Sequence, residues 1–101
     1  MKKSNNEIKE TENKVTLVGE VKNIFFQTNK VVKFNLCTFE KSKNGKQLYH
    51  FVPVKAFGDY CLEEGDEITV IGSIGTEKNE YKGKTTWETV VTADSIAETE
   101  D

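Results

Sequence analysis

The sequence VVKFNLCTFEKSKNGKQLYHFVPVKAF, residues 31–57, carries the clearest structural signal in the chain. Two runs rich in valine and phenylalanine, 31–39 and 48–57, flank SKNGK at 42–46. β-Branched and aromatic residues favour strands, and Asn44 with Gly45 tolerates the positive φ angles of a tight turn. We therefore predict a β-hairpin.

Similar runs precede and follow this hairpin. They cover about 14–26, 67–76 and 85–96, and EYKG at 80–83 marks a further turn. The only helix candidate, 58–64, is at most two turns long. Five strands with a short connector between the third and the fourth are typical of a small closed barrel, and closure removes exposed sheet edges. We predict an all-β, five-stranded OB-fold Greek-key barrel with a very short connector helix between strands 3 and 4.

The 101 residues suffice for one domain. We expect a disordered N-terminal arm over 1–13, an OB-fold domain over 14–96 and a short acidic tail, AETED, over 97–101. No apolar stretch approaches the roughly 18 residues that a membrane span needs, and the N-terminus lacks the apolar segment of a secretory signal. Two cysteines without a Cys-x-x-Cys spacing suit a cytoplasmic protein with free thiols.

Catalytic and metal-binding patterns are not recognisable in the sequence. His50 is the only histidine, and nothing places a serine, a histidine and an aspartate together. Acidic residues gather at 63–67, but without the Asp-x-Asp-x-Asp-Gly pattern of a calcium loop. We predict that the protein is not an enzyme and has no catalytic residue, metal or cofactor.

Strand alternation gives the predicted strands two different faces. The core is expected to be lined by Val32, Phe34, Leu36, Val52, Val54, Ala56, Ile68, Val70, Gly72 and Ile74. The opposite face of the central hairpin presents Phe39, Phe51 and Phe57 beside Lys33 and Lys55. Exposed rings can stack on bases while lysines neutralise phosphates, although the same face could instead be buried in a partner or a second copy.

The charge is distributed unevenly along the chain. The net charge is −3, but residues 30–55 hold six lysines and one acid, whereas residues 59–67 hold five acids and no base. The chain contains no arginine. Lysine neutralises a phosphate as a point charge but lacks the bidentate fork that favours base-specific recognition.

Five segments, in order along the chain, resemble the bacterial and phage single-stranded DNA-binding protein family. They are NKVTLVGEV at 13–21, VVKFNLCT at 31–38, HFVPVKAFGD at 50–59, LEEGDEITVIGSIGTEKNEYKG at 62–83 and TTWETVVTADSI at 85–96. The resemblance implies sequence-independent binding of single-stranded DNA in replication, recombination and repair. It also implies contacts with replication or recombination proteins. A homo-oligomer is expected because one small barrel contacts few nucleotides: the family forms tetramers, and the first strand, with Thr16, Val18 and Glu20 outward, could pair with its copy in a dimer.

Carried onto this sequence, the resemblance places Phe51 and Phe57 at stacking positions on the third strand. Tyr81, in a hairpin shorter than the family's, and Phe39, offset by a few residues, match approximately. Trp87 lies on the last strand, in the core or at its rim. The predicted DNA-binding set is Phe39, Tyr49, Phe51, Phe57, Tyr81, Trp87, Lys33, Lys41, Lys43, Lys46, Lys55, Lys78, Lys82 and Lys84.

The sequence departs from the family in three places. The connector at 58–65 is shorter, the long tail with a hydrophobic tip is missing, and the arm at 1–12 is extra. These departures favour a short version from a phage or mobile element, or a specialised relative such as a primosomal accessory subunit. Two alternatives stay open: single-stranded RNA as the ligand, and a protein-interaction module, which the balance of 11 lysines against 11 acids over 14–96 supports.

Overall fold

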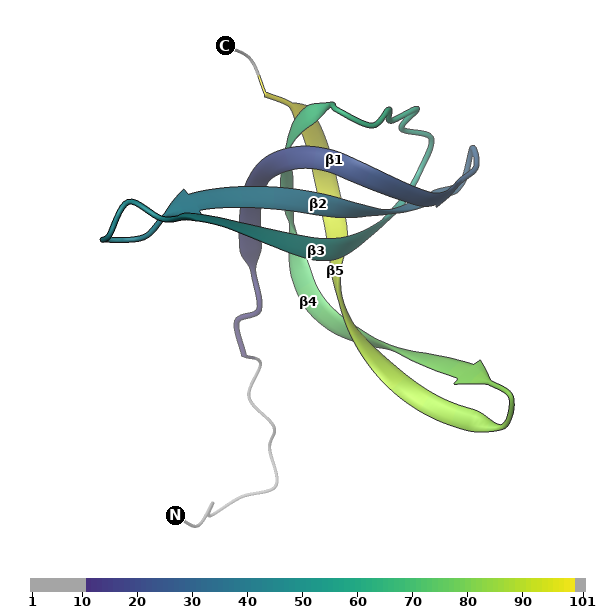
Figure 1. Ribbon diagram of the computed structural model, residues 1–101. Helices are drawn as coiled ribbons and strands as arrows, with labels where there is room; N and C mark the ends of the chain where they lie inside the picture. The colour runs from purple at the N-terminus through teal and green to yellow at the C-terminus, as the bar shows by residue number, and fades with distance from the viewer. Residues whose placement is uncertain (1–10, 100–101) are drawn as a thin grey trace, which may run out of the picture.

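The structure, a computed structural model, describes residues 11–99 and contains five strands in this range. They are β1 (Val15–Gln27), β2 (Val31–Lys41), β3 (Gln47–Phe57), β4 (Glu67–Tyr81) and β5 (Lys84–Glu98). Figure 1 shows that they close into a barrel, in the order β1-β2-β3-β5-β4. The predicted all-β, five-stranded OB-fold barrel is confirmed.

Strand β1 takes part in both halves of the barrel. Residues 15–20 pair with β4, and residues 20–27 pair with β2 through a register that contains two irregularities. Irregularities of this kind bend a strand and increase its twist. The barrel closes where β3 and β5 run parallel, with Val54 opposite Val91.

The core lies inside the barrel and follows the alternation predicted for the central hairpin. Fully buried side chains include Val21, Val32, Phe34, Leu36, Val54, Ala56, Ile68 and Val70. Burying a large aliphatic or aromatic side chain contributes roughly 1.5–3 kcal/mol relative to leaving it exposed. Because a shift of one residue would turn this set outward, hydrophobic burial fixes the register of β2 against β3.

The connector between β3 and β4 is a loop, so the predicted short helix at 58–64 is wrong. Gly58 and Cys61 have φ angles of 141° and 50°, which a right-handed helix does not allow. The Gln27 side chain holds the loop instead, because its amide donates to the Leu62 carbonyl (3.0 Å) and its oxygen accepts from the Leu62 N–H (2.6 Å). Within residues 11–99, no helix is long and apolar enough to cross a membrane.

Ile74 is 48% exposed, which corrects the prediction that it points into the core. The β1–β4 pairing ends at Val15 and Gly72, and β4 continues with β5 as a hairpin that projects from the barrel (Figure 1). The Asn13 side chain extends the pairing by one step. Its nitrogen donates to the Ile74 carbonyl (2.6 Å) and its oxygen accepts from the Ile74 N–H (2.9 Å).

The ends of the sheet differ from the predicted domain limits. Asn13, which was expected in the arm over 1–13, is bound to β4, and residues 1–10 of that arm lie outside the described residues. Strand β5 includes Ala97 and Glu98, which were expected in the tail, and the Thr99 N–H donates to the Glu67 carbonyl (2.9 Å). Residues 100–101 lie outside the described part.

Two glycines of β4 provide a test of the close packing between β4 and β5. A Cβ at Gly72 would overlap the backbone oxygen of Thr92 and lie 2.9 Å from the Ala93 Cα, whereas a Cβ at Gly75 would meet nothing closer than 3.9 Å. We predict that G72A lowers the free energy of unfolding by about 2–3 kcal/mol, as overpacking does. G75A should change it by less than about 1 kcal/mol. Urea denaturation measures both, and equal effects would contradict this packing.

Candidate nucleic-acid interface

Four exposed rings lie on the outer side of the β2–β3 sheet, and we call them the aromatic face: Phe39, Tyr49, Phe51 and Phe57. The register places Phe39 opposite Tyr49, and their ring centroids are 5.2 Å apart. Each ring is 50–64% exposed. The structure thus places four of the predicted site residues on one face of the sheet, each at least half exposed, with the Lys55 ammonium 5.6 Å from the centroid of the Phe57 ring.

Two further exposed rings, Phe25 and Phe26, lie near the end of β1 and were absent from the predicted set. Phe26 is opposite Lys33 of β2, so it extends the aromatic face onto a third strand. Phe25 falls at a register irregularity and has no partner in β2. The sequence contained a signal for this, because side chains of adjacent strand residues point to opposite faces and two neighbouring phenylalanines cannot both enter the core.

The β4–β5 hairpin carries two more predicted rings, on opposite faces. Tyr81 lies beside the Lys82-Gly83 turn, and the Lys82 ammonium is 5.3 Å from its ring centroid. Trp87 is opposite Lys78 and is 66% exposed, which excludes the core position that the sequence had left open. Since Tyr81 and Lys78 are three residues apart, alternation puts Tyr81 and Trp87 on different sides of the hairpin.

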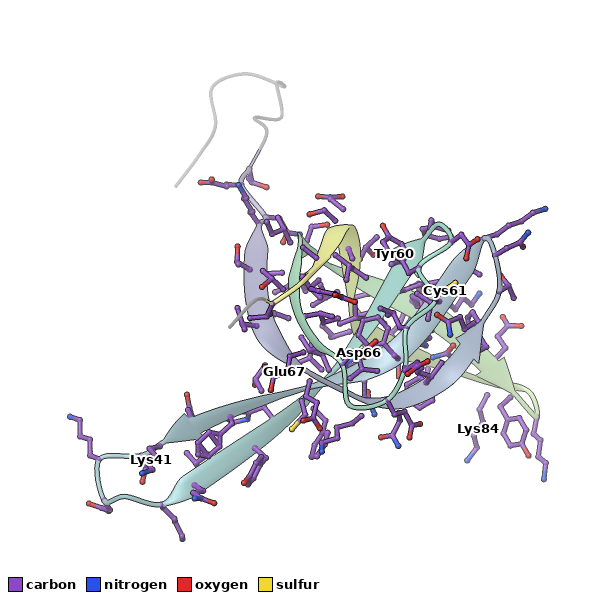
Figure 2. The ribbon with its side chains drawn as sticks, turned by 90° about the horizontal axis from the view of Figure 1, so that it is seen from above. Lys41, Tyr60, Cys61, Asp66, Glu67 and Lys84 are labelled. Carbon is purple, nitrogen blue, oxygen red and sulfur yellow. The ribbon has the colours of Figure 1, made fainter. Side chains whose placement is uncertain are left out.

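The predicted lysines form three groups rather than one cluster. Lys41, Lys43 and Lys46 lie at the end of the β2–β3 hairpin, and Lys78, Lys82 and Lys84 lie on the β4–β5 hairpin. Figure 2 shows Lys41 and Lys84 on these two hairpins, which project from the barrel in different directions. The third group, Lys33 and Lys55, is a cross-strand pair in the middle of the outer face.

The central lysine pair is bound to two glutamates of the β4–β5 hairpin. Lys33 Nζ lies 2.7 Å from Glu88 Oε1 and 3.4 Å from Glu77 Oε1, while Lys55 Nζ lies 2.9 Å from Glu77 Oε2. The hydrogen bond to Glu88 is the main cause that raises the pKa of Lys33. The bond from Lys55 is the main cause that lowers the pKa of Glu77. We call these four residues the ion network.

An open cleft of about 410 Å³ lies between the β1–β2 turn and the connector, and its lining includes Asn29, Asp59, Cys61 and Glu63. Figure 2 shows Cys61 on this connector. A hydrogen bond to Asp59 raises the pKa of the Cys61 thiol, which disfavours the reactive thiolate. No group of three or more potential metal ligands occurs in residues 11–99. The cleft therefore offers no recognisable catalytic chemistry.

Known structures share this fold. An SSB of Plasmodium falciparum, solved in complex with single-stranded DNA, has a TM-score of 0.70 and 19% identity, over 93% of this chain and 100% of the other. The small single-stranded DNA-binding protein of Streptomyces coelicolor has a TM-score of 0.62 and 12% identity, over 89% and 96% of the two chains. No protein-family model and no curated protein matches the sequence.

The ion network predicts a pH dependence of stability. The pKa of Glu77 is lowered from its usual 4.5, so its ionised form stabilises the fold above that value, and the contribution disappears as the pH falls through the lowered pKa. Between about pH 6 and about pH 3 the wild type should lose more unfolding free energy than E77Q, by up to about 1 kcal/mol because the group is partly exposed. Urea denaturation at each pH measures this loss.

The control for this measurement is E63Q. Glu63 forms no ion pair within the described residues, so E63Q should follow the wild-type pH profile. If E77Q also follows the wild-type profile, the ion network does not contribute to stability.

Proposed function

We propose that this protein binds single-stranded DNA without sequence preference, by stacking bases on the aromatic face. The observation that carries the proposal is the set of four exposed rings on two adjacent strands of the barrel, with Phe26 continuing it on a third. The shared fold of two single-stranded DNA-binding proteins supports it. The proposed role is protection of single strands exposed in the cytoplasm during replication, recombination or repair.

Stacking explains why so much aromatic surface is left in water. A row of exposed apolar side chains is unusual in a monomer and marks a binding surface. Base–aromatic stacking contributes about 1–3 kcal/mol per base, and every base has a flat face that can stack. A single strand exposes these faces, whereas a duplex hides them, so the proposed site selects single strands.

The hairpin lysines are proposed to neutralise the phosphates on either side of the stacked bases. They are Lys41, Lys43, Lys46, Lys78, Lys82 and Lys84. The two hairpins project from the barrel in different directions (Figure 2), and a strand bound on the aromatic face is proposed to extend along both. Tyr81 and Trp87 are proposed as further stacking rings, one on each face of the β4–β5 hairpin. Lysine ammonium groups neutralise backbone charge without reading base edges.

A homo-oligomer, a dimer or a tetramer, is part of the proposal. Residues 15–19 of β1 pair with β4 on one edge, while β1 pairs with β2 only from Glu20 onward. Val18, in the unpaired part, is 57% exposed. If this edge paired with the same edge of a second copy, its free backbone groups would be hydrogen-bonded and Val18 would be buried. Association with other replication or recombination proteins is proposed on the resemblance alone.

A second candidate function is a protein-interaction module whose aromatic face is an interface. The ion network favours it, because the two lysines nearest the middle of the face are already neutralised. The two functions differ in their response to salt. Phosphate binding weakens steeply as salt increases, whereas apolar burial does not.

Replacing one ring tests the stacking. We predict that F51A weakens binding of oligo-dT about 5- to 150-fold, the equivalent of about 1–3 kcal/mol for one stacked base. The loss should be similar for other single-stranded base compositions, since stacking is tolerant of sequence. Fluorescence anisotropy of a labelled oligonucleotide at two salt concentrations measures it.

The matched control is F25A. Phe25 is exposed to nearly the same extent as Phe51, 55% against 57%, but has no place in the register of the aromatic face. F25A should lose less affinity for oligo-dT than F51A. Duplex DNA of the same length should bind weakly to both variants. A loss for F51A with only one base composition would overturn the stacking mechanism.

A further inference from the structure

We propose that Glu77 and Glu88 set the strength and salt dependence of single-stranded DNA binding, by occupying the two lysines in the middle of the aromatic face. The inference rests on the proposed function. It assigns to the two glutamates a negative role in binding, and it separates Lys33 and Lys55 from the lysines that contact phosphate.

The geometry brings two positive and two negative groups into one compact set. Lys33 is opposite Lys55 on β2 and β3, and Glu77 is opposite Glu88 on β4 and β5. Glu77 bridges the two lysines, with one carboxylate oxygen on each, and Glu88 makes the shortest contact, 2.7 Å to Lys33. The four charges sum to zero, so the middle of the face offers no net positive charge to a phosphate.

The ion network is packed rather than loosely formed on the surface. The side chains of Lys33, Lys55 and Glu77 are 16%, 26% and 28% exposed, and that of Glu88 is 40% exposed. Val90 lies two residues from Glu88 on the same face of β5, is 1% exposed, and is not part of the central core cluster. Two lysines directly opposite each other repel. The carboxylate of Glu77, which contacts both, offsets this repulsion and thereby stabilises the fold.

This arrangement changes what the two lysines can contribute to binding. A phosphate that approaches them must displace a carboxylate that already accepts their hydrogen bonds, and the displaced glutamate would then lie beside the phosphate. Replacing one anion by another gives little gain, and the salt dependence that comes from neutralising a free phosphate is missing. Five hairpin lysines, by contrast, form no ion pair within the described residues: Lys41, Lys43, Lys46, Lys82 and Lys84.

The test is the salt dependence of oligo-dT binding by E77Q/E88Q. Freeing two lysines adds two phosphate contacts, and each contact steepens the slope of log K against log salt by about 0.7 for a single strand, so the slope should steepen by about 1.4. At about 50 mM salt the variant should bind about tenfold more tightly than the wild type. Glutamine keeps the size of glutamate and can still accept a lysine hydrogen bond.

The matched control is E63Q/E64Q, which also removes two negative charges, but from the connector. If the effect belongs to the ion network, the affinity of this control for oligo-dT should stay within about twofold of the wild-type affinity, because salt screens charges that lie outside the binding face. A second variant, K33Q/K55Q/E77Q/E88Q, removes all four charges and leaves the net charge unchanged. It should also bind within about twofold of the wild type, since the wild-type lysines are already neutralised.

The outcomes separate the two proposals. If the wild type binds oligo-dT and E77Q/E88Q matches E63Q/E64Q, the role of the glutamates is wrong and the proposed function stands. If neither the wild type nor E77Q/E88Q binds, both are wrong. If circular dichroism shows that E77Q/E88Q does not fold, E88Q alone is the test: Glu77 still bridges the two lysines, but one of their two positive charges is then unbalanced, so the slope should steepen by about 0.7. An unchanged slope for E88Q would then overturn the inference.

Discussion

The pairing of β2 with β3 is the constraint on which the binding surface depends. The pairing runs without interruption from Val31 opposite Phe57 to Lys41 opposite Gln47. Because Phe34 and Leu36 are buried on the inner side of this hairpin, Lys33, Phe39 and Phe51 must lie on its outer side. The energy that fixes the core therefore also fixes the aromatic face, and neither can change without the other.

The outer face combines two kinds of interaction that respond differently to solution conditions. The rings offer stacking, which depends on shape and apolar area. The ion network offers charge that is balanced internally, with Glu77 shared between Lys33 and Lys55. In this account the rings supply most of the affinity on the barrel itself, and the salt-dependent part comes from lysines on the two hairpins.

Alternation within the central hairpin made its core and its exposed rings predictable from the sequence. Ile74 was mispredicted because alternation says which side a residue faces but not where the barrel ends. The helix at 58–64 was mispredicted because composition does not reveal the positive φ angle of Cys61 or the long-range bonds from Gln27. The adjacent Phe25 and Phe26 indicate that at least one ring is exposed, but the irregular register of β1, which aligns Phe26 with Lys33, is visible only in the fold. The ion network joins residues 22 to 55 positions apart in the chain, so only the fold reveals it.

The most direct test of the account is to locate bound single-stranded DNA on the protein. Titration of the ¹³C-labelled aromatic side chains with oligo-dT, followed by NMR, reports each ring separately. If bases stack on the aromatic face, the largest shifts should occur at Phe39, Tyr49, Phe51 and Phe57, with the upfield changes typical of stacked bases. Shifts confined to rings outside this face, such as Phe25 and Tyr60, or no shift at saturating oligonucleotide, would contradict it.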